Sequence, residues 1–456
     1  MKKKYGKPSE DLSQARFGDK RLDKRLQTTV EAMSVKAEAS ILSGCGTRHG
    51  AKAFYALLSN SKYSQEKVIK SAQMATVERI KDSEVTEVLL PQDTTDINYN
   101  GHKKTEGLGY SSNTTKGIKV HSCLALKPDG TPLGLMTQLY ETREQAKQAA
   151  PKEELKKRPT AEKESYRWLE TVRKCLELVP TNVNGVVICD REGDFYELYA
   201  DMVSLNTAFV IRITQDRATD KSIRSIQQLK QTTACGKVEI LVPRDSRNNQ
   251  PERVTTMEVA YCHVNIIKPK RTRGGMPEKL TQTLVRITEV SASRNPIEWL
   301  LATNIPVTDA DSAMKIVDRY VHRWKIERFH YILKSGCQVE KIQQRTCEKI
   351  QTVIFIYSVI AAFILALTYF ARLTPDATCD SFLDDSEWKI LYRLVTRKAT
   401  HPNQPYSLQT AVSFLGELGG FKHSPSDGDY GVKSLWKGLS KLFDAIDVLD
   451  RLMGQV

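Results

Sequence analysis

The stretch YVHRWKIERFHYILKSG, residues 320–336, decides how the rest of the chain is interpreted. Its pattern predicts one helix, with Gly336 as a stop signal just past the last turn. Four polar side chains recur along it at offsets of 0, 3, 7 and 14 residues: Tyr320, Arg323, Glu327 and Lys334. At about 100° per residue these offsets fall on one stripe about 60° wide. One carboxylate flanked by donors suits a phosphate bound beside a metal ion, although an ordinary ion-pair face would give the same pattern.

Length and charge favour a large protein with a polyanionic partner. The 456 residues are enough for two or three domains. Lys and Arg number 68 against 54 Asp and Glu, which gives a formal charge of +14 and favours nucleic acid as the partner. The 9 cysteines form no CxxC pair and no cluster with histidine. We therefore expect reduced thiols in a cytoplasmic protein, without a zinc site.

One apolar segment tests the expectation that no membrane is involved. Residues 353–370 contain no charged side chain and are long enough to span a bilayer. We favour a buried core helix instead, because the chain offers no second span and a large α/β core needs a helix that is apolar all round. The N-terminal sequence MKKKYGKPSEDL lacks the apolar region that is typical of a signal peptide.

Both ends of the chain predict helices. Residues 1–80 are basic and predict a helical DNA-binding head in which Arg21 and Arg25 share one helix face; a helical bundle with a solvated basic face is the alternative. Residues 373–456 predict a helical dimerisation region. Its last helix carries a coiled-coil-like apolar seam with 4-3-4-3-4 spacing: Leu435, Leu439, Leu442, Ile446, Leu449 and Met453. Packing of this seam on its own domain is the alternative to a dimer contact.

The middle of the chain predicts an α/β domain in two parts, residues 81–214 and 299–372. The first part predicts three antiparallel strands in succession, then a helix, a fourth strand, a second helix and a fifth strand. The second part begins near EWLLATN and contains the 320–336 stretch. Between the two parts, residues 215–298 predict an all-β insertion.

Acidic residues occupy three matching positions in this order of elements. Asp93 lies on the first strand, Asp190 at the end of the fourth and Glu327 on the final helix. This layout predicts a ribonuclease-H-like core, a mixed five-stranded sheet with helices, in which the first and fourth strands are neighbours. Three converging carboxylates repel one another, and two divalent cations would remove that repulsion and assist an in-line phosphoryl displacement. All-oxygen ligands favour two Mg²⁺ ions, with Mn²⁺ able to substitute.

Three motifs together resemble those of the DDE cut-and-paste transposases of bacterial insertion sequences. They are QDTT at 92–95, CDREGD at 189–194 and Y-x2-R-x3-E-x6-K at 320–334. The third motif is the signature after which one group of these transposases is named. The likeness covers nearly the whole chain, including FGDKR in the head and LGGF near the C-terminus. Residues 144–163 and much of the insertion do not match.

The resemblance implies roles for the signature residues. The two catalytic metal ions would be bound by Asp93, Asp190 and Glu327. The phosphates of the transposon end would be held, near a flipped base, by Tyr320, Arg323 and Lys334.

Four further DNA contacts are implied. Trp299 would stack on the flipped base, which the chemistry needs outside the duplex. A core tryptophan under the insertion is the alternative for Trp299. Arg212 would assist in handling a DNA hairpin, and Arg21 and Arg25 would contact the terminal repeat.

The resemblance also implies a reaction and partners. The family reaction comprises nicking, a hairpin on the transposon end, its resolution, and strand transfer into target DNA. The partners would be double-stranded DNA, as terminal inverted repeats and as target, and a second copy of the chain in a homodimeric synaptic complex. The location would be the bacterial cytoplasm, associated with the nucleoid. Two alternatives are a metal-dependent nuclease that cuts without joining and a DNA-binding inhibitor of transposition.

Overall fold

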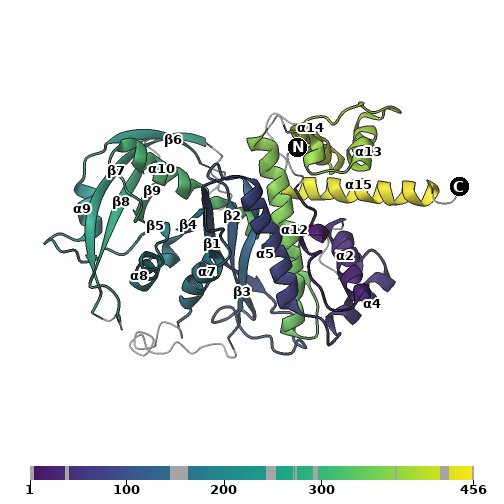
Figure 1. Cartoon of the computed structure of the whole chain (residues 1–456), viewed down its shortest axis with the longest axis horizontal. Helices are drawn as coiled ribbons and strands as arrows, with labels where there is room; N and C mark the ends of the chain where they lie inside the picture. The colour runs from purple at the N-terminus through teal and green to yellow at the C-terminus, as the bar shows by residue number, and fades with distance from the viewer. Residues whose placement is uncertain are drawn as a thin grey trace. The chain divides into compact units, whose positions relative to one another are not determined.

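The computed structural model describes most of the chain, in two compact units (Figure 1). The described residues are 5–35, 41–143, 163–242, 253–270, 272, 275–290, 296–374, 377–421 and 431–453. Unit 1 comprises Met1–Val85, Thr94–Gln148 and Ile326–Val456. Unit 2 comprises Thr86–Asp93 and Ala149–Lys325. Each unit collects segments from several predicted domains, and those predicted boundaries stay predictions. Most of the unmatched loop at 144–163 lies outside the described residues.

Unit 2 is built on a mixed sheet with the strand order β1-β4-β5-β9-β8-β7-β6. The strands are β1 (Glu87–Asn98), β4 (Asn184–Cys189), β5 (Ala208–Arg212), β6 (Gly236–Val242), β7 (Arg253–Ile267), β8 (Lys279–Glu289) and β9 (Glu298–Thr303). The pairs β1–β4 and β4–β5 are parallel, and the other pairs are antiparallel. The α/β class predicted from the sequence is confirmed.

The structure differs from the prediction of a five-stranded core interrupted by an all-β insertion in two respects. Strand β9 pairs with β5 on one side and with β8 on the other, so the inserted strands continue the core sheet. The insertion also contains a helix, α9 (Ser225–Gln231), which packs on β7 and β8. Pairing between distant antiparallel strands leaves no local signal, which is why the sequence did not reveal the continuation.

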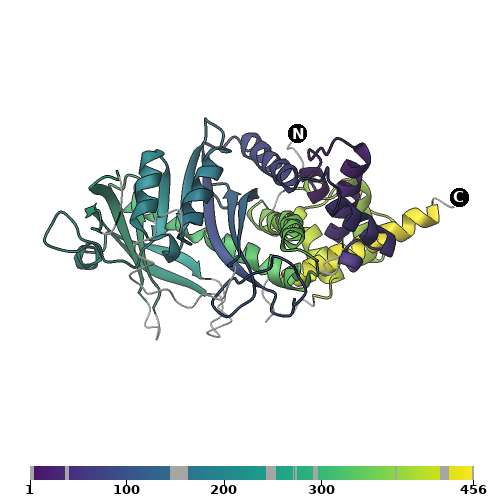
Figure 2. The ribbon, with the colours of Figure 1, turned by 90° about the horizontal axis from the view of Figure 1, so that it is seen from below.

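The two faces of this sheet are covered by different helices. Side chains alternate between the faces along a strand. One face, which includes Cys189 and Ile211, forms an apolar core with α7 (Tyr166–Leu176) and α8 (Tyr196–Ser204). The other face is covered by α10 (Ala310–Val321), which contacts β5, β7 and β8 (Figure 2). Polar side chains on the sheet face that α10 covers therefore lie between the sheet and this helix.

Unit 1 contains a hairpin of β2 (Gly117–Leu126) and β3 (Pro132–Glu141), which lies beside the last residues of β1. The turn is closed by a hydrogen bond from the Lys127 N–H to the Thr131 oxygen, at 2.9 Å. Gly130 has φ +82°, a left-handed conformation that glycine adopts without strain. The antiparallel pairing predicted for the second and third strands is confirmed.

The apolar segment at 353–370 belongs to α12 (Cys347–Leu373), a core helix of unit 1. It packs on β3 and is long and apolar enough to cross a membrane, but 83% of its apolar window is buried inside the protein. The side chain of Thr346 caps its N-terminus by accepting from the Lys349 N–H. Ser358 donates to Gln138 Oε1 at 3.0 Å, so even a polar group on this helix is satisfied by the protein.

The head is helical, as predicted. Its helices are α1 (Pro8–Asp11), α2 (Lys20–Val35), α3 (Ile41–Gly44) and α4 (Arg48–Leu58), and α5 (Gln65–Asp82) follows and packs on β3. In α2 the buried side chains Leu22, Leu26, Val30 and Met33 recur at helical spacing, which gives one apolar face.

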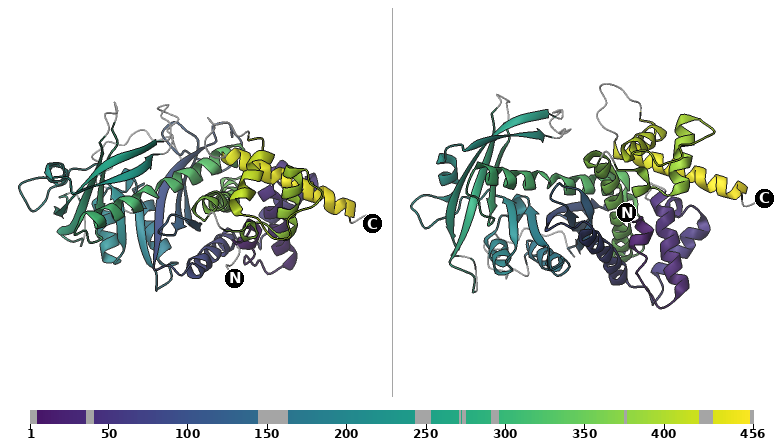
Figure 3. Two further views of the ribbon diagram at one scale, coloured as in Figure 1. Left: turned by 90° about the horizontal axis from the view of Figure 1, so that it is seen from above. Right: turned by 45° about the horizontal axis from the view of Figure 1, so that its top comes forward.

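Three helices end unit 1: α13 (Asp385–Thr396), α14 (Leu408–Leu418) and α15 (Val432–Met453). Figure 3 shows α14 and α15 packed on each other. In the predicted seam, Leu435 and Leu439 are buried within the unit, whereas Leu449 is 38% exposed. The first half of the seam thus packs on its own unit, which was the alternative to a dimer contact.

A glycine permits the close approach of α14 and α15. A Cβ on Gly438 would lie 1.8 Å from the backbone oxygen of Leu415. Ala normally stabilises a helix interior by about 1 kcal/mol relative to Gly. We expect Gly438→Ala instead to lower the free energy of unfolding by about 1–3 kcal/mol, because the backbone oxygen cannot move aside easily.

Chemical denaturation of the purified variant measures this effect. Gly431→Ala is the matched control, because a Cβ there meets no atom within 4 Å. A Gly438→Ala protein as stable as the wild type would contradict the close packing of the two helices.

Candidate functional site

Two of the predicted acidic residues occupy corresponding positions on neighbouring strands. β1 and β4 pair in parallel, with Pro91 opposite Ile188. Asp93 and Asp190 each follow two residues later, just beyond the paired segment. The prediction that the first and fourth strands are neighbours is therefore confirmed.

Both carboxylates belong to the sheet face that α10 covers. Gln92 Nε2 donates to Cys189 Sγ at 3.3 Å, on the face beneath α7 and α8. Asp93 is the next residue of β1 and Asp190 directly follows the last residue of β4, so both turn to the opposite face. Burial raises the pKa of the Cys189 thiol well above its usual value, and the charges of Asp190 and Asp93 raise it further. Both carboxylates therefore lie within electrostatic reach of one sulfur atom.

A tight turn orients Asp190. Its Oδ1 accepts a hydrogen bond of 2.8 Å from the N–H of Glu192, as the cap of the 3-10 turn η2 (Arg191–Gly193). A Cβ on Gly193 would lie 2.6 Å from the Cβ of Cys189. Glycine is therefore needed at position 193 for this turn to fold back on the end of β4.

A phenol and two guanidinium groups lie near Asp190 within unit 2. Tyr320, near the end of α10, is 1% exposed, and its hydroxyl has no hydrogen-bond partner among the described residues. The Arg323 guanidinium lies 5.5 Å from the centre of its ring. Burial raises the pKa of Tyr320, the charges of Arg323 and Arg212 oppose the rise, and Asp190 adds to it. A buried hydroxyl without a partner costs about 1–3 kcal/mol and suits a site that receives a polar ligand.

Trp299 is packed in this structure. It lies on β9, is 5% exposed, and makes edge-to-face contacts with Tyr320 and Trp324 at centroid distances of 5.3 and 5.7 Å. This is the arrangement of the core-tryptophan alternative, and stacking on a flipped base stays a prediction. Nearby, Arg212 donates to the Glu298 backbone oxygen at 3.4 Å.

The prediction of one helix across 320–336 is wrong. Helix α10 ends at Val321, and α11 (Trp324–Tyr331) begins after a two-residue turn. The chain then forms the π turn η3 (Ile332–Gly336). The wider π turn changes the angular step per residue, so the four signature side chains do not share the predicted stripe. π turns of this kind are frequently found at functional sites.

The remaining signature residues lie in unit 1. Glu327 is exposed on α11. Lys334, in η3, donates to the Asp96 backbone oxygen at 2.8 Å and lies 3.5 Å from Glu340. Within the described ranges, no three His, Cys, Asp or Glu side chains are grouped as a metal site. The oxygen donors Asp93 and Asp190 of unit 2 and Glu327 of unit 1 are of the type that hard divalent cations prefer.

The two head arginines differ in exposure. The Arg21 side chain on α2 is 89% exposed and lies 3.4 Å from Asp19. Arg25, one turn later, is half-buried. Arg21 immediately precedes the buried Leu22 and Arg25 immediately precedes the buried Leu26, so both arginines lie on the first turns of α2 beside its apolar face.

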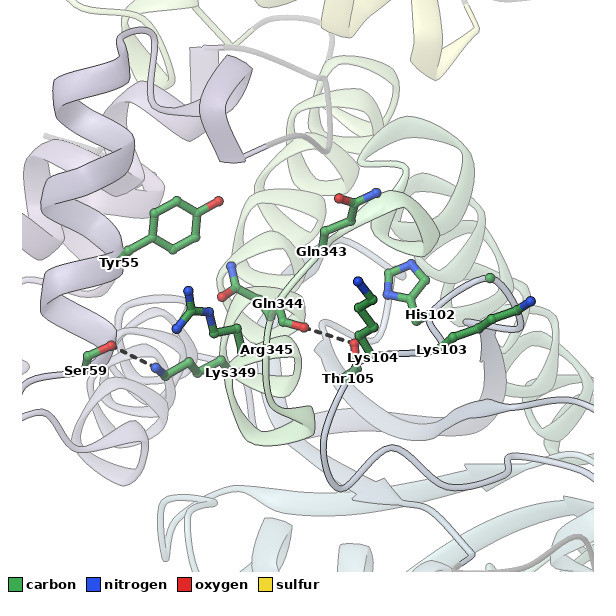
Figure 4. A pocket seen from close by; sticks show the side chains of 11 residues that line it. Tyr55, Ser59, His102, Lys103, Lys104, Thr105, Gln343, Gln344, Arg345 and Lys349 are labelled. Carbon is green, nitrogen blue, oxygen red and sulfur yellow. Dashed lines mark hydrogen bonds between the residues drawn. The ribbon is translucent and has the colours of Figure 1, made fainter.

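Sequence reasoning missed a basic pocket within unit 1 (Figure 4). Its volume is about 790 Å³. Its cationic lining residues are Lys103, Lys104, Arg345 and Lys349, and Tyr55, Ser59, Gly101, His102, Thr105, Gln343 and Gln344 complete it. The run GHKKT at 101–105 was a signal, but only folding brings it beside residues 343–349. Burial lowers the pKa of His102, and the charge of Lys116 lowers it further.

Hydrogen bonds hold the walls of the pocket together. Thr105 Oγ1 donates to the Gln344 backbone oxygen at 2.9 Å. Lys349 Nζ donates to Ser59 Oγ at 2.8 Å, next to the end of α4. The pocket therefore joins the helical head to the first turn of α12.

His330, on α11 three residues after Glu327, makes the free energy of unfolding depend on pH. Burial, together with a smaller contribution from the charge of Lys334, lowers its pKa from 6.5 to about 3. Below pH 6.5 the unfolded chain binds a proton that the folded chain does not, so stability is lost as the pH falls. We expect this group alone to remove about 2 kcal/mol between pH 7.5 and pH 5.

Urea unfolding at the two pH values tests this expectation. His330→Gln should lose about 2 kcal/mol less than the wild type over this pH interval. The exposed His49 supplies the control, since His49→Gln should keep the wild-type pH dependence. Equal losses in wild type and His330→Gln would contradict the neutral buried imidazole.

Two protein families match the chain. The family "Transposase DNA-binding" matches residues 9–63, which include α2 to α4 with Arg21 and Arg25. The family "Transposase DDE domain" matches residues 163–364, which include Asp190 and Glu327. Asp93 precedes the second match.

A solved structure is also similar, at 10% sequence identity and a TM-score of 0.30: a piggyBac transposase synaptic complex with hairpin DNA. The similarity covers 72% of this chain and 58% of that chain. The two family matches account for both the helical head and most of the α/β region. The chain belongs to the DDE-type DNA transposases.

Proposed function

We propose that this chain performs cut-and-paste transposition of a bacterial insertion sequence. The proposed steps are nicking of the transposon end, formation and resolution of a hairpin there, and strand transfer into target DNA. The observation that carries the proposal is the β1–β4 register, which places Asp93 and Asp190 at corresponding positions on one sheet face. The match to a transposase DNA-binding family supports double-stranded DNA as the partner.

We assign the metal ligands to Asp93, Asp190 and Glu327. DDE transposase domains depend on divalent metal ions, and carboxylate oxygens fit Mg²⁺. A pair of such ions supplies activation of an attacking oxygen and stabilisation of the leaving oxygen. The charges of Asp93 and Asp190 both act on the buried thiol of Cys189, which supports the assignment of the two carboxylates to one site. Glu327 supplies the third carboxylate from the exposed side of α11.

In this proposal the transposon end is held by the hydrogen-bond donors Tyr320, Arg323 and Lys334. A phosphate oxygen would satisfy the buried hydroxyl of Tyr320 and pair with the guanidinium of Arg323 beside it. Lys334 supplies a further cation from the π turn. Arg212 lies close enough to Tyr320 to influence its pKa, which supports the assignment of Arg212 to the hairpin. Trp299 would stack on a flipped base after it leaves its present aromatic contacts.

The basic pocket of unit 1 is assigned to the DNA backbone. Lys103, Lys104, Arg345 and Lys349 offer four cations in one concave surface beside the head. Positively charged concave surfaces attract phosphates without reading sequence. Arg21 and Arg25 on the head are assigned to the terminal repeat.

Homodimerisation is assigned to the distal half of α15. Apolar side chains there are unusually exposed: Val448 by 54%, Leu449 by 38% and Leu452 by 60%. An exposed apolar stripe on a helix suits a contact with another copy. The proximal half of the same helix is occupied within unit 1.

The acidic residues give the first test of this function. We expect Asp190→Asn and Glu327→Gln each to reduce Mg²⁺-dependent nicking of a labelled transposon end by at least about 100-fold, because each removes a ligand charge. Binding of the end, measured by gel shift, should stay within about twofold. Glu258→Gln, a surface carboxylate paired with Lys237, is the control.

The products of the same assay separate the alternatives. A transposase joins the cleaved end to a supercoiled target, whereas a nuclease leaves only cut DNA. A DNA-binding inhibitor binds the end without cutting it. If Glu327→Gln nicks DNA at the wild-type rate, the assignment of Glu327 as a metal ligand is wrong.

The pocket gives a second test. We expect Arg345→Ala combined with Lys349→Ala to weaken binding of DNA of any sequence and to lower the salt slope, log Kd against log salt concentration, by about 1–2. Lys174→Ala combined with Lys237→Ala removes the same charge from surface pairs in unit 2 and should leave the slope unchanged. If the double variant lost affinity only for DNA with the terminal-repeat sequence, the assignment of the pocket to the DNA backbone would be wrong.

A further inference from the structure

A buried carboxylate, Asp194, ends the turn that Asp190 begins. Its side chain has no exposed surface. It follows Asp190 by four residues and forms the C-terminal cap of η2. Charged side chains are rarely this buried unless their partners are close, so the surroundings of Asp194 show what it holds in place.

Four donors converge on the Asp194 carboxylate. Oδ2 accepts from the backbone N–H groups of Thr214 and Gln215, at 2.7 and 2.8 Å. Oδ1 accepts from the Tyr199 hydroxyl at 2.9 Å and from the Arg217 guanidinium. Both oxygens are therefore saturated by α8 and by the segment that follows β5. No donor of this set is itself one of the proposed catalytic residues.

Arg217 is bound from several sides as well. The same Nη2 atom donates to the backbone oxygen of Asp194 at 2.8 Å, and the guanidinium lies 5.5 Å from the ring centre of Tyr199. The Arg217 N–H donates to Ser225 Oγ at 2.9 Å, at the start of α9. The Asp194–Arg217 pair is thus a satisfied interior ion pair that joins three elements of unit 2.

This pair connects two parts of the proposed site. Asp190 caps η2 at one end, and Asp194 ends it at the other. Thr214 and Gln215, which Asp194 holds, come directly after the β5 strand that carries Arg212. Loss of the carboxylate would release both the turn behind Asp190 and the end of β5.

We propose that Asp194 is a positioning residue for metal binding: it fixes the η2 turn against the end of β5, and so holds Asp190 in the orientation in which it ligates a divalent cation. The inference rests on the proposed function, in which Asp190 is a metal ligand. Outer partners that orient a metal ligand typically change metal affinity by 10–100-fold when they are removed.

The test measures Mn²⁺ affinity of the full-length protein by calorimetry, without any need for catalysis. We expect Asp194→Asn to raise the Kd for Mn²⁺ by about 10-fold or more. The substitution keeps the shape of the side chain but removes its negative charge. The buried guanidinium of Arg217 then lacks a counter-charge, which destabilises the folded protein. Asp194→Asn combined with Arg217→Gln removes both charges and keeps the measurement possible if the single variant does not fold.

Two further variants separate positioning from stability. Tyr199→Phe removes one hydrogen bond to Asp194 and should raise the Kd by a few-fold only. Asp201→Asn, on the same helix as Tyr199, breaks an ion pair with the half-exposed Arg173 and should leave the Kd unchanged. If Asp194→Asn and the double variant lower the unfolding midpoint but bind Mn²⁺ as tightly as the wild type, Asp194 is only structural and the proposal fails.

A parallel assay keeps this failure distinct from failure of the proposed function. Nicking by Asp194→Asn should need about 10-fold more Mg²⁺ and should recover at high Mg²⁺, whereas nicking by Asp190→Asn should not recover. If the wild type neither binds Mn²⁺ nor nicks DNA, the proposed function and this inference both fail. If the wild type does both and Asp194→Asn has an unchanged metal requirement, the inference alone fails.

Discussion

The parallel pairing of β1 with β4 is the constraint on which the rest of unit 2 depends. It sets Pro91 opposite Ile188 and thereby brings Asp93 and Asp190 to corresponding positions. A slip of one residue in either strand would turn one carboxylate to the opposite sheet face. That face is apolar beneath α7 and α8, and burying a charge there without a partner would be costly. The hydrophobic pattern that builds the core therefore also selects the register that builds the site.

Two polar side chains on the core side of the sheet are held by buried hydrogen bonds. Gln92 contacts Cys189, and Asp194 accepts from four donors, one of which is Arg217. Such saturated networks are rigid, because every displacement breaks a buried hydrogen bond. On the α10 side the Tyr320 hydroxyl is buried without a partner among the described residues. A rigid support behind a buried hydroxyl that can still accept a ligand favours pre-organised binding.

The sequence predicted the parts of this arrangement that local patterns determine. Asp93 and Asp190 were found because each follows an apolar run of residues, and the order of elements made the two strands neighbours. The single helix across 320–336 failed because offset counting assumes a constant angle per residue, which a turn and a π turn both change. The sheet beyond β5 and the pocket at residues 101–105 depend on pairing between distant segments, and such pairing leaves no periodic trace in the chain.

The aromatic cluster of Trp299, Tyr320 and Trp324 sets the energetic condition for the proposed binding of DNA. Each edge-to-face contact stabilises the cluster by about 0.5–1.5 kcal/mol beyond the burial of its surface. The unpartnered hydroxyl of Tyr320 opposes it by about 1–3 kcal/mol. Freeing the Trp299 ring would also expose surface that is now buried, so the packed arrangement is favoured until a ligand compensates for both losses. A phosphate that satisfies Tyr320 and a flipped base that replaces the lost ring contacts would together favour the open arrangement, because each compensates for one cost of opening.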